Sequence, residues 1–404
     1  MIQEKSKRVA EFEKNAFGMF IHWGLYSQMG EGEWIWFLKK IEKKEYIKLI
    51  DTFDPKDFNA DNIVNLAKRA GMKYITLTTR HHEGFSLYDT RGLSQFDITH
   101  TSCKRDLVLE FVGACRRGGI KPILYNTTLD WYQESYKNDF QSYLEYLRKS
   151  VEILCTHYGE IGGFWFDGNW NKPNQDWKLD ELYGTIRRLQ PNALIINNTG
   201  LDDRGTIIHE EVDSVTFEQG RPLPMNREGM KKYITAEMCN TINDDWGIGK
   251  LDYMNKSTAE LIETLCACRK VGANYLLNVG PTATGELLKI QEATLEELGK
   301  WIEVNGEAIY DPKPCEVKGY DKDFALQGEN GNLYLFIHEL SVFQKGTTPR
   351  PFTSFNNKVK KITWLDNNEE LKFAQNLDCG LFCLMPTKYP HGCNLVVRVA
   401  KVEF

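Results

Sequence analysis

The sequence lacks an excess of positive charge, a long apolar run and an apolar leader segment. Its 404 residues include 50 Lys and Arg against 56 Asp and Glu, a formal net charge of −6 at pH 7. Such a chain has no electrostatic basis for binding nucleic acid. No apolar stretch reaches the ~18 residues of a membrane helix, and residues 1–14 are rich in charge. We expect a cytoplasmic protein with no nucleic-acid or membrane partner.

Paired metal-binding cysteines are absent as well. The ten Cys residues are scattered, and none stands in a C-x-x-C pair. Cys266 and Cys268 fall in a helical stretch, and Cys379 and Cys383 have no second pair at zinc-site spacing. We expect reduced thiols that pack as small apolar side chains.

Internal repeats and low-complexity segments are also missing, so the chain is an ordinary globular sequence. Its length suggests two domains, or one large barrel with an addition. Short apolar strands alternate with amphipathic helical stretches over the first three-quarters, which is typical of a parallel sheet. The expected strands are 17–23, 73–79, 120–125, 162–167, 193–197, 214–218, 233–238 and 274–279. The expected helices are 62–70, 107–118, 139–158, 180–189, 257–271 and 290–309.

Eight such units predict an α/β fold, a TIM-like (β/α)8 barrel over residues 1–310. The barrel should be irregular, because the link between strands six and seven has little room for a helix. Residues 311–314 form a Pro-containing linker, and the strands beyond it are short and separated by turn residues. They predict a small antiparallel β-sandwich over residues 311–404, with strands at 333–338, 361–365, 371–374, 380–385 and 394–402.

The most informative segment is the aromatic strand 162–167, which ends in Asp167 and is followed by Gly168. A carboxylate at that place is held rigidly at the edge of a core, between aromatic side chains that can stack on a ligand. Such a group suits a nucleophile in sugar chemistry. The alternative is an acidic N-cap of a following helix, which is common after a strand in α/β proteins.

The ends of the other strands carry polar side chains too. In a barrel of this type, function collects at the carboxyl ends of the strands. The residues found there or just beyond are His22, His81, His82, Tyr125, Asp167 and Glu218, and strand seven carries Glu237. This recurrence predicts one polar site at the rim.

Two of these groups allow several interpretations. His81 and His82 could bind ligand hydroxyls, form a core pair or hold a metal, but neighbours on a strand point to opposite faces and rarely share an ion. Glu33 and Trp34, on a glycine-rich loop, could hold a sugar through a hydroxyl and a ring face, or merely anchor the loop.

Several segments together resemble the α-L-fucosidases of glycoside hydrolase family 29. The matching segments follow the family's order along the chain. They are FGMFIHWG (17–24), GEW (32–34), TRHHEGF (79–85), KRDLV (104–108), WFDG (165–168), TINDDWG (241–247), LLNVGPT (276–282) and VNGEAIY (304–310).

The resemblance implies a role for each matching residue. Asp167 corresponds to the nucleophile, and Glu218 fits one position used for the acid/base, with Glu237 as the alternative. The positions that hold the fucose hydroxyls and ring are His22, Glu33, Trp34, His81, His82 and Tyr125. Trp165 and Trp246 match the aromatic wall near the sugar methyl group. The arginine that often follows strand five is missing here, and that contact is absent or supplied by Arg204.

The expected function is exo-acting hydrolysis of terminal α-L-fucosides by a retaining double displacement, without a metal or organic cofactor. The expected partner is a fucosylated oligosaccharide or glycoconjugate, and both a monomer and a homo-oligomer are compatible with the sequence. Two alternatives stay open: a non-catalytic or differently specific sugar-binding barrel, and a barrel hydrolase with a metal at His81 and His82.

Overall fold

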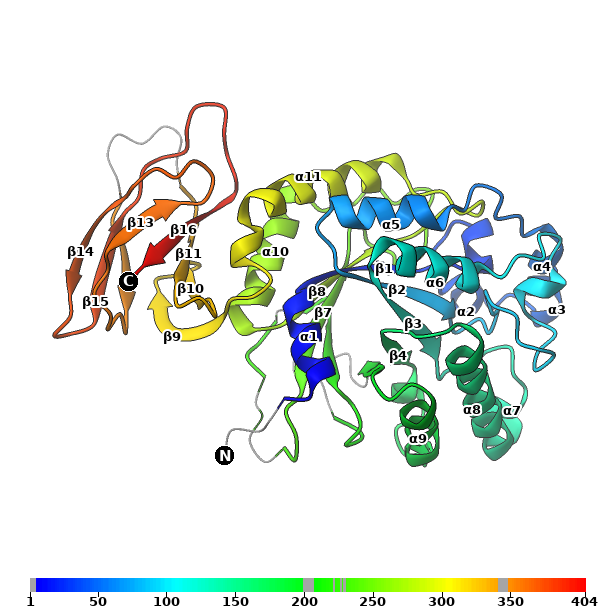
Figure 1. Ribbon diagram of the computed structural model, residues 1–404. Coiled ribbons are helices and arrows are strands. Elements are labelled where there is room, and N and C mark those ends of the chain that lie inside the picture. Colours follow the sequence, from blue (N-terminus) through cyan, green and yellow to red (C-terminus); the bar gives the residue numbers. More distant parts are fainter. Residues whose placement is uncertain (1–4, 199–206, 221, 226, 228–229, 341–347) are drawn as a thin grey trace.

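A closed barrel of eight parallel strands forms the larger part of the molecule (Figure 1). The computed structural model describes residues 5–198, 207–220, 222–225, 227, 230–340 and 348–404. The strands are β1 Phe17–Ile21, β2 Tyr74–Arg80, β3 Lys121–Thr127, β4 Gly163–Asp167, β5 Leu194–Asn198, β6 Ser214–Glu218, β7 Thr235–Thr241 and β8 Asn274–Val279. Each pairs with its neighbours in sequence, and β1 closes on β8. The predicted barrel is confirmed.

The period of two in strand β4 shows how the sequence builds the barrel wall. Phe164 and Phe166 pack in the layer between strands and helices, whereas Trp165 packs in the barrel interior. Asp167 lies on the same side of the strand as Trp165, because alternate side chains share a face. The aromatic run is therefore a strand buried on both faces.

The outer layer contains the predicted helices. They are α5 Ala60–Arg69, α6 Leu107–Gly118, α8 Phe140–His157, α9 Leu179–Leu189, α10 Thr258–Val271 and α11 Lys289–Asn305. The sequence missed α1 Lys7–Asn15, whose Val9 and Phe12 are buried. It also missed the one-turn helices α2 Ile35–Leu38, α3 Lys43–Tyr46, α4 Leu49–Thr52 and α7 Ser135–Asn138. Among the described residues of the β5–β6 and β6–β7 links no helix occurs.

The C-terminal part is one eight-stranded antiparallel sheet wrapped around its own core. Its strands are β9 Lys313–Gly319, β10 Phe324–Gln327, β11 Leu333–His338, β12 Arg350–Thr353, β13 Lys361–Trp364, β14 Lys372–Asn376, β15 Leu381–Met385 and β16 Val397–Glu403. Buried side chains from seven of these eight strands meet in one cluster, as in a sandwich. The sequence missed β9, β10 and β12. Pro314 lies inside β9 and Pro351 inside β12, and a proline in the sequence argues against a strand at its position.

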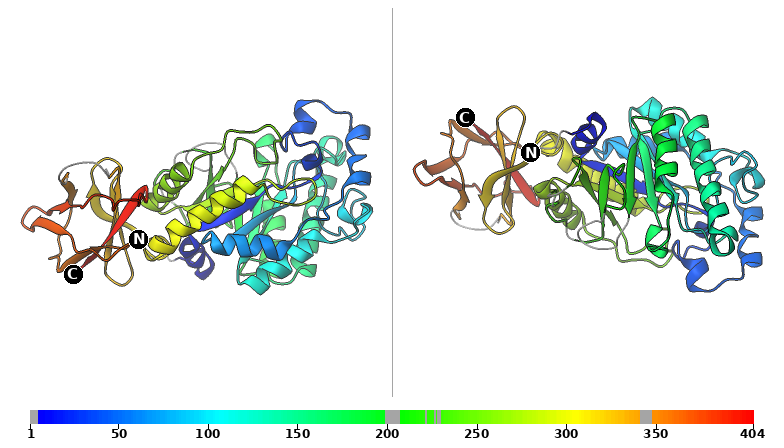
Figure 2. Two further views of the ribbon diagram at one scale, coloured as in Figure 1. Left: turned by 90° about the horizontal axis from the view of Figure 1, so that it is seen from above. Right: turned by 90° about the horizontal axis from the view of Figure 1, so that it is seen from below.

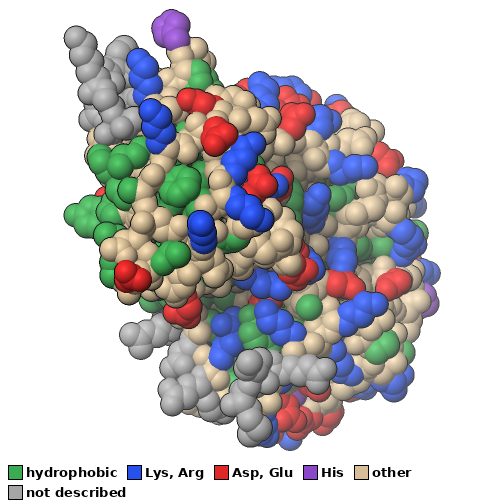
Figure 3. All heavy atoms as spheres, turned by 60° about the vertical axis from the view of Figure 1, so that its left-hand side comes forward, with side chains coloured by type: hydrophobic (Ala, Val, Ile, Leu, Met, Phe, Trp, Pro, Cys, Tyr) green, Lys and Arg blue, Asp and Glu red, His purple; other side chains and the backbone are tan. Residues whose placement is uncertain are grey.

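The two parts share a packed boundary, which lies beside α10 and α11 in both views of Figure 2. Strand β11 turns Leu335 to the C-terminal core and Phe336 to the barrel side. Figure 3 shows acidic and basic side chains intermingled over the visible face. Within the described residues, no helix has both the length and the apolar character to cross a bilayer.

Candidate active site

Asp167 ends strand β4 at the carboxyl rim of the barrel. The chain turns immediately after it at Gly168, whose φ is +108°. A Cβ on this glycine would lie 2.6 Å from the Leu129 backbone nitrogen, so a larger residue would force the loop apart. The aromatic strand and the glycine together present the carboxyl at the rim.

Three side chains orient the Asp167 carboxyl by donating hydrogen bonds. The Tyr125 hydroxyl donates to Oδ2 at 3.0 Å, and Trp170 Nε1 donates to Oδ1 at 2.9 Å. Asn198 Nδ2 lies 3.3 Å from the same Oδ1. The N-cap alternative does not hold, because this side chain caps no helix and the following turn has Gly168 as its N-cap residue. The Asp167 carboxyl is therefore held at the rim in one orientation.

Glu218 ends strand β6 and joins the same network. Asn198 Nδ2 donates to its Oε2 at 2.7 Å while also facing Asp167 Oδ1. One nitrogen atom therefore lies 2.7 Å from a Glu218 oxygen and 3.3 Å from an Asp167 oxygen, so the two carboxyl groups are close neighbours. Burial, and next the nearby Asp167 charge, raise the pKa of Glu218 to about 7. Such a carboxyl is poised to give and take a proton near neutral pH.

Glu237 lies inside the barrel rather than at its rim. Its side chain is fully buried in β7, where the Tyr74 hydroxyl and Trp165 Nε1 both donate to it, the latter at 2.9 Å. Burial raises the pKa of Glu237 to about 7. Its bond to Trp165, which stacks on Tyr125 at 5.5 Å, makes it a support for the aromatic wall.

His22 is a buried imidazole with a defined tautomer. Asn278 Nδ2 donates to the Trp246 carbonyl at 2.7 Å, which turns Asn278 Oδ1 toward His22 Nδ1 at 2.7 Å. His22 Nδ1 must therefore carry the hydrogen, and Nε2 is left as an acceptor. Burial lowers the pKa of His22 to about 3. The ring is uncharged near neutral pH.

His82 has the same arrangement. The Thr127 hydroxyl donates to the Leu129 carbonyl and so accepts from His82 Nδ1 at 2.6 Å. The other ring nitrogen lies 3.5 Å from Asp167 Oδ2. Burial lowers the pKa of His82. Its Nε2 is an acceptor beside the rim carboxyl.

His81 and His82 lie side by side, which corrects the expectation that they point to opposite faces. Their ring centroids are 4.2 Å apart, because β2 ends at Arg80 and both residues belong to the turn beyond it. His81 also stacks on Tyr125 at 5.5 Å and contacts His22 at 5.5 Å. The three imidazoles form one cluster, and two of them, His22 and His81, lie against the Tyr125 ring.

Glu33 and Trp34 approach the site from the loop after β1. The backbone N–H of Gly247 donates to Glu33 Oε2 at 2.7 Å, and burial raises the pKa of this carboxyl to about 7. The Trp34 ring lies 5.4 Å from that of His82 and 6.2 Å from that of Trp170. Trp34 therefore lies at the site beside His82, and Glu33 lies beside the segment that contains Trp246 and Gly247.

Trp165 and Trp246 extend the histidine cluster with indole rings. Trp165 is almost fully buried in the interior, and Trp246, partly exposed, lies 5.0 Å from the ring of His22. Phe20 packs between the two indoles, at 5.0 Å from Trp165 and 5.9 Å from Trp246. The result is an apolar wall that adjoins the histidine cluster, because both Phe20 and Trp246 contact the His22 ring.

Sequence reasoning did not assign roles to Trp170, Asn198, Asn278 or Thr127. Trp170 follows Asp167 by three residues, and this short spacing is the sequence feature that could have indicated its role. The other three act through partners on different strands, which no local pattern reveals. Arg204 lies outside the described residues. Among the described residues, no group of three His, Cys, Asp or Glu side chains is placed to hold a metal.

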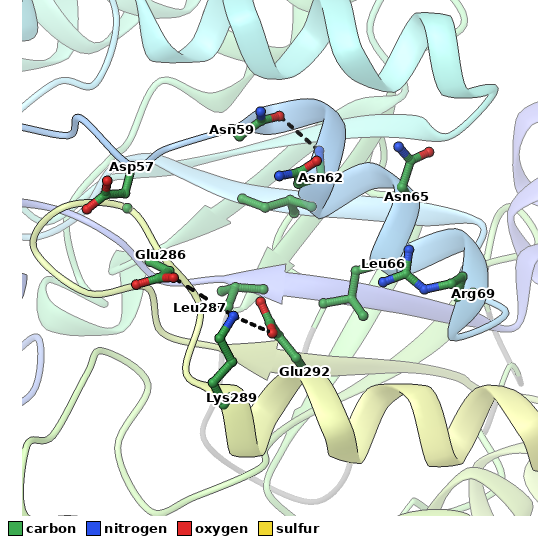
Figure 4. A pocket seen from close by; sticks show the side chains of 12 residues that line it. Asp57, Asn59, Asn62, Asn65, Leu66, Arg69, Glu286, Leu287, Lys289 and Glu292 are labelled. Atoms are coloured by element: carbon green, nitrogen blue, oxygen red, sulfur yellow. Dashed lines mark hydrogen bonds and ion pairs between the residues drawn. The ribbon is translucent and has the colours of Figure 1, made fainter.

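A separate cavity of about 330 Å³ lies outside the barrel, between the starts of α5 and α11 (Figure 4). Its walls are mostly polar, with Asn59, Asn62 and Asn65 on one side and Glu286 and Lys289 on the other. None of the predicted site residues lines it. The rim carboxyls and histidines therefore form a distinct site.

A barrel rim with two linked carboxyls, three uncharged imidazoles and indole walls defines a carbohydrate-cleaving hydrolase. The chain belongs to the α-L-fucosidases of glycoside hydrolase family 29, because the family model described as Alpha-L-fucosidase matches residues 2–307. The predicted family, and with it a glycoside hydrolase acting on α-L-fucosides, is confirmed.

Relatives of known function span nearly the whole chain. The tissue α-L-fucosidase of Mus musculus is 29% identical over 430 residues, covering 97% of this chain and 92% of the relative. That of Bos taurus is 28% identical, covering 94% and 85%. α-L-Fucosidase isoenzyme 1 of Paenibacillus thiaminolyticus is 30% identical, with a TM-score of 0.83 and 98% of both chains covered.

A fourth relative was captured in the course of its reaction. The Bacteroides thetaiotaomicron α-L-fucosidase, solved as a trapped covalent intermediate with 2-fluoro-fucosyl fluoride, is 25% identical. Its TM-score is 0.87, with 99% of this chain and 97% of that chain covered.

Proposed function

We propose that this protein is an exo-acting, retaining α-L-fucosidase with Asp167 as nucleophile and Glu218 as general acid/base. The observation that carries the proposal is Asn198, whose Nδ2 reaches both carboxyls, at 3.3 Å and 2.7 Å. Two carboxyls joined through one amide nitrogen are compatible with the about 5–5.5 Å that separates the carboxyl groups of retaining pairs. The covalent intermediate of the Bacteroides relative is consistent with retention.

In the first step, Asp167 attacks the anomeric carbon as the bond to the leaving oxygen breaks. Glu218 gives its proton to that oxygen, which requires a carboxyl that is still protonated near neutral pH. In the second step, ionised Glu218 takes a proton from water, the water oxygen attacks the anomeric carbon, and Asp167 leaves. Fucose is released with its original anomeric configuration.

The division of the site between polar and apolar walls suits fucose. This sugar has hydroxyls at C2, C3 and C4 and a methyl group at C5. His22 and His82 would accept hydrogen bonds from hydroxyls through Nε2, together with His81 and Glu33. Trp165 and Trp246 would pack on the methyl group and ring. The expected substrate is the terminal fucose of an oligosaccharide or glycoconjugate.

Substitution of Asp167 tests the nucleophile. Asp167→Ala should lower turnover of an aryl α-L-fucoside by the equivalent of about 4–7 kcal/mol in barrier while the protein stays folded. Azide should restore turnover and yield the β-fucosyl azide, because it attacks from the vacated face. Substantial turnover in the absence of azide would exclude Asp167 as nucleophile.

Proton NMR of the first fucose released by the wild-type protein tests retention. The α anomer should appear before mutarotation. An initial β anomer would show a single displacement instead.

Three further expectations stay predictions. Exhaustive chelation should leave activity unchanged, because the proposed chemistry needs no metal or organic cofactor. Monomer and homo-oligomer are to be distinguished by light scattering. The cytoplasmic location stays a prediction from the sequence. The non-catalytic sugar-binding alternative is disfavoured because both rim carboxyls are present and linked.

A further inference from the structure

Trp246 belongs to the loop between β7 and α10, residues 242–257. Its ring lies 5.0 Å from that of His22 and is partly exposed, so part of the indole surface is free to contact a ligand. An indole on a loop can serve as a fixed wall only if the loop keeps one conformation. The hydrogen bonds of this loop therefore decide where the indole stands.

Two hydrogen bonds fix the backbone at Trp246 and at the residue that follows it. Asn278 Nδ2 donates to the Trp246 carbonyl at 2.7 Å, and the Gly247 N–H donates to Glu33 Oε2 at 2.7 Å. Neither of these bonds holds residues 243–245, which lead into the tryptophan. The place of the indole therefore depends on a further contact.

Residues 243–245 are held by one carboxylate, that of Asp252. Its Oδ2 accepts from Asn243 Nδ2 at 2.7 Å, from the Asp244 N–H at 2.9 Å and from the Asp245 N–H at 3.1 Å. Its Oδ1 accepts from the Met254 N–H at 3.1 Å. Hydrogen bonds to a charged acceptor are roughly twice as strong as neutral ones. Four donors thus converge on this half-buried group.

The chain folds back tightly to bring Asp252 to this place. A Cβ on Gly249 would lie 2.9 Å from the Asp252 Cβ and 2.8 Å from Asp245 Oδ2, so a larger residue would push the turn open. Burial raises the pKa of Asp252, but its hydrogen bonds outweigh that effect and lower the pKa below its ordinary value. The acceptor is therefore a full negative charge at neutral pH.

We propose that Asp252 is a positioning residue for substrate specificity, because its carboxylate holds residues 243–245 and thereby sets the place of the Trp246 indole. The proposal rests on the proposed function, in which Trp246 packs on the methyl group of fucose. None of the four donors to Asp252 belongs to a proposed catalytic or substrate-binding residue, so the carboxylate acts through the loop.

The experiment compares kcat/KM for an aryl α-L-fucoside and the matching aryl β-D-arabinopyranoside, which has the same ring hydroxyls and lacks the methyl group. Wild type should prefer the fucoside by about 10–200-fold, which is the value of one apolar carbon in a fitted pocket. Asp252→Ala should lower that preference at least about fivefold, mainly through loss of rate on the fucoside. Asp252→Asn keeps one acceptor oxygen and should fall between the alanine variant and wild type.

A double-mutant cycle tests whether Asp252 acts through Trp246. Trp246→Ala should lower the preference by itself, and Asp252→Ala should change it less than about twofold in that background, because the indole is already gone. The matched control is Asp139→Ala, which removes a carboxyl that accepts two hydrogen bonds from Ser142 at the start of α8. This control should lose stability and keep the wild-type preference.

The possible outcomes separate this proposal from the proposed function. An unchanged preference in either Asp252 variant, or additive effects of Asp252→Ala and Trp246→Ala, overturns the positioning role. An equal loss of preference in Asp139→Ala overturns it as well, because general destabilisation would then account for both losses. The asparagine variant provides the same test should the alanine variant fail to fold. Wild-type protein that is inactive on the fucoside, or that cleaves both glycosides equally, contradicts the proposed function instead.

Discussion

Asn198 is the side chain on which the arrangement of the two rim carboxyls depends. Its Nδ2 faces both of them, and its Oδ1 accepts from the Thr216 hydroxyl at 2.6 Å, which fixes the amide orientation. The amide therefore acts as a donor toward Asp167 and Glu218. Single side chains at this rim have roles that can be separated by substitution.

Glu218 and Glu237 can be distinguished by the leaving group. Glu218→Ala should keep most of its glycosylation rate on a good phenolate leaving group and lose about 10²–10⁴-fold on a poor one. Azide should then yield the α-fucosyl azide by attack on the glycosyl-enzyme. Glu237→Ala should affect all substrates alike, because it loosens Trp165. The reverse pattern would make Glu237 the acid/base.

The pH profile tests the link from Asn198 to Glu218. The proton donor must be protonated, so kcat/KM for a poor leaving group should fall as pH rises through the Glu218 pKa of about 7. The Asn198 hydrogen bond lowers this pKa. Asn198→Ala should therefore move the basic limb to higher pH. Glu237→Gln is the control and should leave the limb in place; a limb that moves equally in both variants contradicts the assignment.

At the scale of elements, the turn after β2 is hydrogen-bonded to the loop that follows β1 and to helix α3. Glu83 is buried beside the histidine pair, where it accepts from the Leu25 N–H at 3.0 Å and from the Tyr46 hydroxyl. Tyr46 stacks on Trp36 at 4.3 Å, in the helix that follows Trp34. One carboxyl thus connects β2, α3 and α2.

This carboxyl should make stability depend on pH. Burial raises the folded-state pKa of Glu83 to about 8, against about 4.3 in an unfolded chain. Between these values the folded protein binds more protons, so its free energy of unfolding falls as pH rises. Glu83→Gln, which resembles the protonated form, should lose less stability than wild type between pH 5 and 8, by on the order of a few kcal/mol. Denaturant unfolding of both proteins at pH 5 and pH 8 measures these losses of stability. An equal loss in wild type and in the variant would contradict the prediction.

At the scale of the whole molecule, the C-terminal sheet completes the cover of the barrel. Phe336 and Val399 pack with the barrel cluster, and Trp301 Nε1 of α11 donates to the Val397 carbonyl at 3.1 Å. Phe336 is fully buried and stacks on Phe324 at 4.3 Å. The two parts are expected to unfold together.

Loss of this contact should loosen the boundary between the parts. The predicted linker 311–314 is wrong in its second half, because Lys313 and Pro314 already pair in β9. Phe336→Ala should cost about 3–5 kcal/mol and speed proteolysis at residues 310–312, just before that strand. Leu335→Ala, on the other face of β11, should destabilise the sheet core with less effect on linker cleavage. Mass spectrometry of the fragments also tests the predicted boundary at residues 310 and 311. Equal linker cleavage in both variants would contradict the shared boundary.

Much of this architecture was readable from neighbouring residues alone. The aromatic strand ending in Asp167 and the helix at 107–118 follow from local period, because strand and helix repeats are properties of a few consecutive residues. The positions of His22, His81, Tyr125 and Glu218 at one rim follow from the topology, since parallel barrel strands all end on the same side.

What only the tertiary structure decided is how those residues are connected. Glu218 and Glu237 stand on adjacent strands with similar pKa values, yet one faces Asp167 through Asn198 and the other faces Tyr74 inside the barrel. The imidazole tautomers likewise depend on Asn278 and Thr127, far away in sequence. Hydrogen bonds act over about 3 Å of space and not along the chain. The sequence therefore determined which groups reach the rim, and the closed barrel decided which of them meet.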